Sequence, residues 1–259
     1  MHLEVITRRP TSAPRPTPLL FVHGAWHGAW CWDEYFLPYF AEHGYEAHAL
    51  SLRGHGKSAG ALRWSSWIDY VNDVEQVARS LATLPVLIGH SLGGYVVQKY
   101  LESRRAPAGV LLASLPVNGV LPFLLRYTGR HPLPMLKTVL TLNGYHMIAA
   151  PKTSRAAFFS ADIPDEQAHR YHERLGSESF RMILDSGLLA LPNPARVTVP
   201  VLVLAAERDA IFTRREQERT AQAYLTQAEF FPVAHDMMLE AGWQAVADRI
   251  LSWLAARGL

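Results

Sequence analysis

Short apolar runs alternate with longer amphipathic segments along most of the 259-residue chain. The apolar runs suit strands that are buried on both faces, and the amphipathic segments have the spacing of helices that cover a sheet. This alternation predicts an α/β fold with a mostly parallel, twisted sheet flanked by helices. The expected strands are residues 3–7, 19–22, 46–50, 85–88, 109–113, 201–205 and 229–231, and the expected helices are residues 30–42, 66–82, 93–104, 213–224 and 243–256.

The alternation stops after residue 113 and resumes at residue 201. Several prolines divide the intervening segment into short helix-like pieces. A structureless loop of this length is uncommon inside a compact domain, so the segment is expected to fold. We predict a core domain formed by residues 1–114 and 195–259, with a mainly helical cap at residues 115–194 inserted into it.

Charge and cysteine content exclude several classes of protein. The chain has 25 Lys and Arg against 23 Asp and Glu, without a dense basic stripe, so no nucleic-acid partner is expected. Its one cysteine, Cys31, excludes an internal disulfide and a cysteine-rich metal site. The first residues lack a secretory signal, and no apolar run reaches the length of a membrane span. We expect a cytoplasmic monomer or homodimer that needs no metal or cofactor.

The sequence GHSLG at residues 89–93 joins an expected strand to an expected helix. A nucleophile on a tight strand-to-helix turn needs small residues two positions away on either side, and Gly89 and Gly93 meet this need. The turn also places Ser91 near a helix N-terminus, where N–H groups favour developing negative charge. Ser91 is therefore the candidate nucleophile, and the alternative is a glycine-rich turn with an inert serine.

A serine nucleophile needs a base, and the chain has 12 histidines. His235 follows the last expected strand, on a loop at the carboxyl edge of the sheet, and is the predicted base. His90 precedes the nucleophile, but its side chain cannot reach back across the turn. Two carboxylates follow the strand at 201–205: Asp209 lies further into the loop and is the predicted acid, whereas Glu207 is the fallback. The resulting chain order is Ser, Asp, His.

Two backbone N–H groups are predicted to hold the oxyanion of the transition state. One belongs to Leu92, and the other to the turn after the strand at 19–22, where Ala25 is the first choice and Trp26 the alternative. His23, in the same turn, is expected to stabilise the turn rather than to act in catalysis. An apolar cap above the site favours an acyl or aromatic substrate over a charged one. The candidate pocket residues are Trp26, Phe123, Leu124, Leu140, Phe158 and Phe159.

These motifs resemble those of the α/β-hydrolase superfamily over essentially the whole chain. The sequence HGAWHGAWCW at residues 23–32 is similar to the plant methylesterase and hydroxynitrile lyase branch and to its bacterial esterase relatives. The turn RGHGKS at residues 53–58 is familiar across the superfamily. The resemblance implies hydrolysis of small-molecule carboxylic esters, with short- to medium-chain acyl or aromatic groups, through an acyl-enzyme. It also implies oxyanion donors at Ala25 and Leu92.

Other activities are compatible with the same triad. Hydroxynitrile lyases of that branch carry a threonine where Gly24 stands and a lysine where Asp236 stands, so both departures disfavour lyase chemistry. A receptor-like ligand-binding protein with weak turnover is a further alternative, and perhydrolase, amidase and carbon–carbon bond hydrolase activities stay open. Epoxide hydrolases and haloalkane dehalogenases are disfavoured because they place an aspartate at the position of Ser91.

Overall fold

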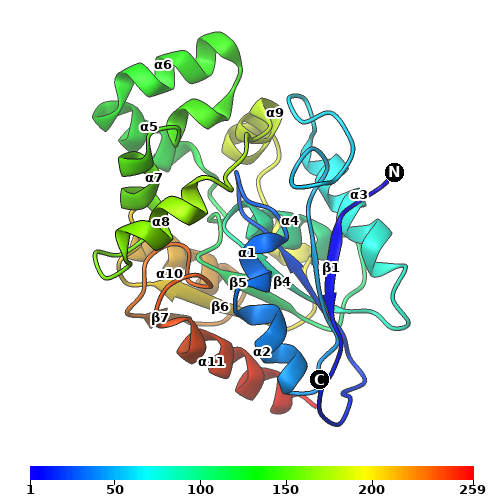
Figure 1. Ribbon diagram of the computed structural model, residues 1–259. Helices are drawn as coiled ribbons and strands as arrows, with labels where there is room; N and C mark the ends of the chain where they lie inside the picture. Colours follow the sequence, from blue (N-terminus) through cyan, green and yellow to red (C-terminus); the bar gives the residue numbers. More distant parts are fainter.

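A sheet of seven strands forms the centre of the molecule in the computed structural model, which describes residues 1–259 (Figure 1). The strands lie in the order β1-β3-β2-β4-β5-β6-β7. β1 is antiparallel to β3, and every other neighbouring pair is parallel, which confirms the predicted α/β class. The strands are β1 (Val5–Arg8), β2 (Leu19–Val22), β3 (Ala47–Leu50), β4 (Val86–His90), β5 (Gly109–Leu112), β6 (Val201–Ala206) and β7 (Ala228–Phe231).

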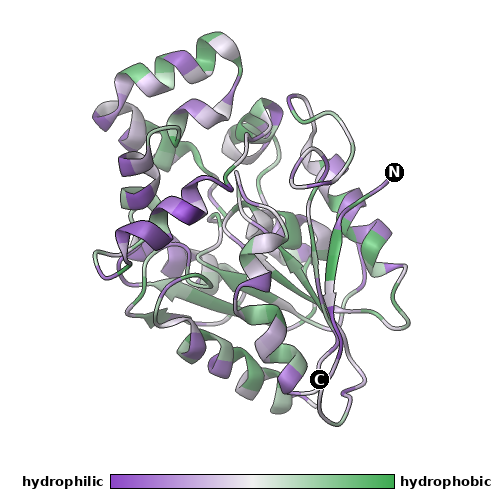
Figure 2. Ribbon diagram, viewed as in Figure 1, coloured by the Kyte–Doolittle hydropathy of each residue, from purple (hydrophilic) through white to green (hydrophobic).

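Helices cover both faces of this sheet (Figure 1). Because of this cover, every residue of β2 to β6 is buried, and Figure 2 shows hydrophobic residues concentrated in the strands. One face is covered by α1 (Trp30–Asp33), α2 (Phe36–Glu42) and α11 (Trp243–Ala255). The other is covered by α3 (Trp67–Ala78), α4 (Leu92–Leu101) and α10 (Arg214–Ala223).

The single helix expected at residues 30–42 is wrong, because the structure divides it into α1 and α2. Tyr35, between them, has φ −137° and ψ −48°, which is not helical. Pro38 explains the break: it lacks an N–H group, and its ring would clash with the carbonyl of Glu34 in a continuous helix. Placed in the first turn of α2 instead, the proline needs no partner inside the helix.

The segment between β5 and β6 is mostly helical and lies at one end of the sheet (Figure 1). Pro132 and Pro151 occupy the first positions of α6 and α7, where a missing N–H group costs no hydrogen bond. The helices of this insertion are α5 (Leu121–Arg130), α6 (Pro132–Thr141), α7 (Pro151–Phe158), α8 (Asp165–His172) and α9 (Phe180–Leu184), with short 3₁₀ helices at Gly144–Met147 and Pro194–Arg196 and a π-helical segment at Asp185–Leu189. No helix of the molecule has the length and apolar character needed to cross a membrane.

Candidate active site

Ser91 lies at the turn from β4 to α4, with φ 50° and ψ −117°. Non-glycine residues rarely adopt a positive φ, and such strain is frequent at functional sites. The backbone is crowded on both sides of the turn. A Cβ at Gly89 would come within 2.4 Å of the carbonyl oxygen of Gly93, and one at Gly93 within 2.2 Å of that of Val22. Only glycine fits at either position, and the turn presents Ser91 to a cavity.

His235 and Asp209 face each other from the loops that follow β7 and β6. The Nδ1 atom of His235 lies 3.0 Å from both carboxylate oxygens of Asp209. Oδ1 of Asp209 also accepts hydrogen bonds from the N–H groups of Ile211, at 2.8 Å, and Phe212, at 3.0 Å. Because the carboxylate can only accept, Nδ1 of His235 carries the hydrogen, and Nε2 is left to accept a proton.

His235 packs against a residue that lines the cavity containing Ser91, but does not line the cavity itself. Phe212 lines this cavity, and its ring centroid lies 5.5 Å from that of His235. His90, the residue before the nucleophile, donates a hydrogen bond from Nε2 to the carbonyl oxygen of His235 at 2.9 Å. Burial and the nearby His235 lower the pKa of His90 to about 3, so His90 is a neutral donor. It therefore connects the turn of the candidate nucleophile to the loop of the candidate base.

The turn after β2 packs directly against Ser91. A Cβ at Gly24 would come within 2.8 Å of His90 Nδ1 and 3.1 Å of the Ser91 Cβ, so a larger residue would not fit without a shift. Ala25 and Leu92 line the same cavity as Ser91. The N–H of Ala25 donates to no other group of the protein, and Leu92 is the first residue of α4, where N–H groups lack a partner within the helix. Both N–H groups are therefore without a partner inside the protein.

Two side chains fix the conformation of this turn. His23 donates from Nδ1 to the carbonyl oxygen of Gly24 at 2.7 Å and accepts the N–H of Leu52 at Nε2 at 3.0 Å. Burial lowers the pKa of His23 well below its ordinary value, so the ring stays neutral in this role. Trp26, which has φ 66°, donates from its indole nitrogen to the carbonyl oxygen of Gly144 in the insertion at 3.2 Å.

A model of the alpha/beta hydrolase family matches residues 19–249. The chain belongs to this family. The hydrolase is 29% identical over 217 residues to a non-heme chloroperoxidase from Burkholderia pyrrocinia, and 75% of each chain is covered. It is 34% identical over 112 residues to a probable esterase from Oryza sativa subsp. indica, which covers 39% of this chain and 40% of the rice protein. An esterase structure from Exiguobacterium antarcticum has a TM-score of 0.75 at 18% identity, covering 98% of the hydrolase and 95% of that chain, and this likeness shows the shared fold.

Two adjoining cavities lie between the core of the hydrolase and the inserted helices. The smaller, of about 60 Å³, is the one that contains Ser91. The larger, of about 320 Å³, lies between α5, α7 and the loop after β6. Among the predicted pocket residues, Trp26 and Phe123 line both cavities, Leu124 lines the smaller and Phe158 the larger.

The predicted pocket residues Leu140 and Phe159 line neither cavity, which corrects the sequence-based expectation. Leu140 lies on α6, which turns its apolar residues outward, and the side chain is 74% exposed. Phe159 is buried inside the insertion, where its ring packs 5.6 Å from that of Tyr171. Helical spacing shows which residues share a face, but not whether the face points toward a cavity or toward solvent.

Glu178 places a buried carboxylate in the smaller cavity, and nothing in the sequence marks it. Its Oε1 accepts hydrogen bonds from the Tyr70 hydroxyl and the Ser179 N–H, both at 2.6 Å. Its Oε2 lies 3.3 Å from Nε2 of His55, a residue of the RGHGKS turn. Burial lowers the pKa of His55, but the adjacent Glu178 carboxylate raises it above its ordinary value. The pair joins the insertion to the core beside the cavity.

Asp236 is a second buried carboxylate close to the candidate base. Its Oδ2 lies 3.0 Å from Nε2 of His27, whose Nδ1 donates to the carbonyl oxygen of Ala25 at 2.8 Å. Burial raises the pKa of Asp236, but the neighbouring His27 more than offsets this and keeps it below its ordinary value. His90, His235 and Asp236 each offer an atom that could bind a metal ion, and these atoms lie within 4.8 Å of one another. Nε2 of His90 and Nδ1 of His235, however, already form the hydrogen bonds described above.

The charge of Asp236 should set the pH range of activity together with Asp209. Burial lowers the pKa of His235, but Asp209 and then Asp236 raise it above its ordinary value. A base must be neutral, so kcat/KM should fall as the pH drops through this pKa. Asp236→Asn removes a negative charge and keeps an acceptor for His27. We expect the acidic limb of the profile to move to lower pH, as measured by kcat/KM against pH. An acidic limb that stays at the same pH or moves to higher pH would contradict this role of Asp236.

Proposed function

We propose that this hydrolase cleaves carboxylic esters of small molecules through an acyl-enzyme formed on Ser91. The observation that carries the proposal is the Asp209–His235 hydrogen bond, which is separated by the ring of Phe212 from the cavity that contains Ser91 on a strained turn. The relatives named as esterases support the same reaction class. Turnover of p-nitrophenyl butyrate is the direct test, and an inactive, correctly folded protein would exclude the proposal.

The reaction follows from the donors and acceptors around the smaller cavity. Nε2 of His235 takes the proton of Ser91 as the serine oxygen attacks the ester carbonyl carbon. The carbonyl oxygen becomes an oxyanion and accepts hydrogen bonds from the N–H groups of Ala25 and Leu92. The tetrahedral intermediate then collapses, and His235 delivers the proton to the departing alcohol oxygen. A water molecule, deprotonated by His235, releases the acid in the second half of the reaction.

The smaller cavity is the acyl chamber in this proposal, because the acyl group stays attached to Ser91. Its lining is mostly apolar, with Leu115, Met182 and Ile183 among the residues that surround the nucleophile. At about 60 Å³ the chamber is much smaller than the neighbouring cavity of about 320 Å³. The expected acyl group is therefore short, and the upper part of the medium-chain range is disfavoured.

Specificity should depend on acyl length with an early maximum. Each methylene buried in the chamber contributes about 0.8 kcal/mol, or nearly fourfold in kcat/KM. We expect kcat/KM for p-nitrophenyl esters to rise from acetate to butyrate and to fall beyond hexanoate, where the chamber is full. Steady-state kinetics over acetate to decanoate measure this. A steady decline from acetate, or a rise that continues to decanoate, would remove the acyl-chamber assignment without affecting the triad.

Two alanine variants separate the chamber from the surface of the insertion. Ile183→Ala enlarges the chamber, so the preferred acyl chain should become longer. Leu140→Ala removes the same class of side chain from an exposed position of α6 and should leave the preference in place. An equal shift in both variants would indicate a general change in the insertion rather than a change in the chamber.

Lyase chemistry gains no support from the site. The residue at the position of the lyase lysine, Asp236, is fully buried, paired with His27, and lines neither cavity. At Gly24, the position of the lyase threonine, a Cβ would come within 2.8 Å of His90. At both positions where the sequence differs from the lyases, the surrounding structure suits the residue that this chain has. Ester hydrolysis is therefore the function that we favour.

A further inference from the structure

The larger cavity has a cationic wall. Its 15 lining residues include the cations Arg126, Arg130 and Lys152 together with His131, and none of them is an aspartate or a glutamate. The remaining lining is largely apolar, with Trp26 among the residues shared with the acyl chamber. A concave site lined by one sign of charge and apolar walls attracts ligands of the opposite sign. The chemistry of this cavity therefore differs from that of the apolar chamber beside it.

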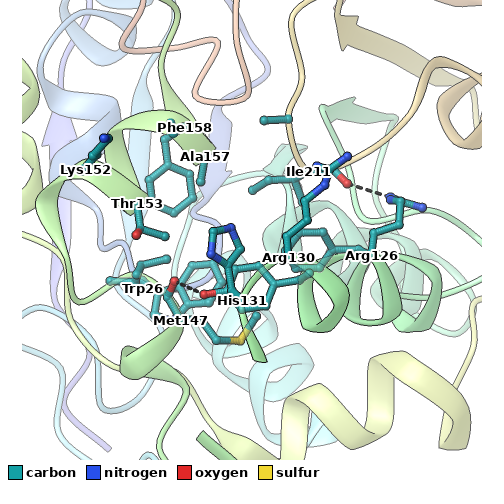
Figure 3. A pocket seen from close by; sticks show the side chains of 15 residues that line it. Trp26, Arg126, Arg130, His131, Met147, Lys152, Thr153, Ala157, Phe158 and Ile211 are labelled. Carbon is teal, nitrogen blue, oxygen red and sulfur yellow. Dashed lines mark hydrogen bonds between the residues drawn. The ribbon is translucent and has the colours of Figure 1, made fainter. Parts of the chain in front are cut away.

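Three of these side chains have no anionic partner within the protein. Arg126 is neutralised, because it forms hydrogen bonds to both carboxylate oxygens of Glu216, at 2.8 and 3.0 Å. Arg130, His131 and Lys152 form no ion pair or side-chain hydrogen bond. In Figure 3 the Arg130 side chain rises from its helix toward Ile211, His131 lies near the middle of the view, and Lys152 stands on the other side of His131. These three side chains are free to contact an anionic group.

The position of the cavity relative to His235 suggests which part of a substrate it receives. Phe158 lines the cavity, and its ring is stacked on that of His235 with centroids 6.3 Å apart. Ala210 and Ile211, from the loop that carries Asp209, line it as well. His235 delivers its proton to the leaving oxygen, so the leaving alcohol lies on the histidine side of the ester bond. The acyl group occupies the chamber around Ser91, and the larger cavity is left for the alcohol.

We propose that the substrate is an ester whose alcohol part carries an anionic group, in the simplest case a carboxylate, which is attracted to the larger cavity by the positive charges of Arg130 and Lys152. This inference rests on the proposed esterase function and adds the class of leaving group to it. The sequence predicts an uncharged substrate, because the insertion is rich in apolar residues. The present proposal replaces that prediction with a substrate that is negatively charged on its alcohol part. A charge-assisted hydrogen bond from either cation to the anionic group would fix the orientation of the alcohol part.

The test compares two aryl butyrates whose para substituents are similar in size but differ in charge: 4-butanoyloxybenzoate and 4-butanoyloxybenzamide. Each kcat/KM is divided by the rate constant for hydroxide hydrolysis of the same ester, which corrects for leaving-group reactivity. We expect the wild-type hydrolase to prefer the carboxylate ester by about tenfold at low ionic strength. The preference should weaken as sodium chloride is added, because salt screens partly exposed charges.

Two variants test whether the cationic side chains cause the preference for the carboxylate ester. Arg130→Gln combined with Lys152→Gln should lower the ratio of the two corrected kcat/KM values to near one. Arg196→Gln removes an exposed arginine from the turn before β6, at the opposite end of that strand from the Asp209 loop, and should leave the ratio unchanged. Calorimetric titration of both esters into the Ser91→Ala variant gives the same comparison without turnover.

The outcomes separate this inference from the proposed function. Hydrolysis of both esters at similar rates, or a preference that survives in the Arg130→Gln, Lys152→Gln variant, overturns the anionic leaving group and leaves the esterase proposal standing. No turnover of either ester, but tighter binding of the carboxylate ester that is lost in the double variant, supports the anion site and overturns the esterase proposal. Equal binding of the two esters to the Ser91→Ala variant overturns the anion site in either case.

Discussion

Ser91→Ala should reduce ester turnover by about four orders of magnitude or more, because no other group in the acyl chamber can form the acyl-enzyme. The serine oxygen is the only part of the side chain that is lost, and alanine leaves the surrounding glycine contacts unchanged. The fold should therefore persist, with an unchanged circular dichroism spectrum. The measurement is kcat/KM for p-nitrophenyl butyrate with the purified variant, alongside the uncatalysed rate.

A second serine in the same chamber provides the matched control. Ser186 lines the cavity with Ser91, but its hydroxyl donates to the carbonyl oxygen of Met182 at 2.6 Å and has no base beside it. Ser186→Ala should retain most of the turnover. A fluorophosphonate probe, which reacts with activated serines, should label Ser91 alone in the wild-type protein. Labelling at another serine, or full activity in Ser91→Ala, would remove the nucleophile assignment.

Asp209→Asn should lower kcat by about three to four orders of magnitude, and the structure indicates why. The N–H groups of Ile211 and Phe212 both donate to Oδ1 of Asp209, so the amide oxygen of an asparagine would occupy that position. The amide NH2 would then lie where Oδ2 now stands, 3.0 Å from Nδ1 of His235. Nδ1 would have to accept, the hydrogen would move to Nε2, and the base could no longer take the proton of Ser91.

The neighbouring carboxylate in the same loop is the control for this substitution. Glu207 is exposed, and it makes no side-chain hydrogen bond or ion pair. Glu207→Gln should change kcat less than threefold, in keeping with the small effects of exposed surface substitutions. Steady-state kinetics of the two variants with one ester decide the assignment. A mild effect at Asp209 and a severe one at Glu207 would identify Glu207 as the acid.

The three triad candidates could be found in the sequence because their positions follow from the sheet. In a parallel sheet the carboxyl ends of the strands meet at one edge, so residues that follow β4, β6 and β7 come together however far apart they lie in the chain. Ser91, Asp209 and His235 are such residues. Gly89 and Gly93 mark the turn of the nucleophile, and the structure shows backbone crowding at both.

The substrate cavities could not be found in the same way, because they depend on how the inserted helices pack. Leu140 and Phe123 have similar apolar surroundings in the sequence, yet Leu140 is exposed on α6 whereas Phe123 lines both cavities. Arg130 ends α5 and Lys152 lies in the first turn of α7, and only tertiary packing brings them to one cavity. Glu178 reaches the acyl chamber from a segment between two helices, which no periodicity marks.

The insertion of residues 113–200 between β5 and β6 also has a consequence for folding. Ser91 precedes this segment, and Asp209 and His235 follow it, so the candidate triad cannot assemble until β5 pairs with β6. That pairing closes a loop over the whole insertion, and the entropy of closure grows only with the logarithm of loop length, by about 0.6 kcal/mol per doubling. The closure entropy alone therefore adds little to the cost of a longer insertion.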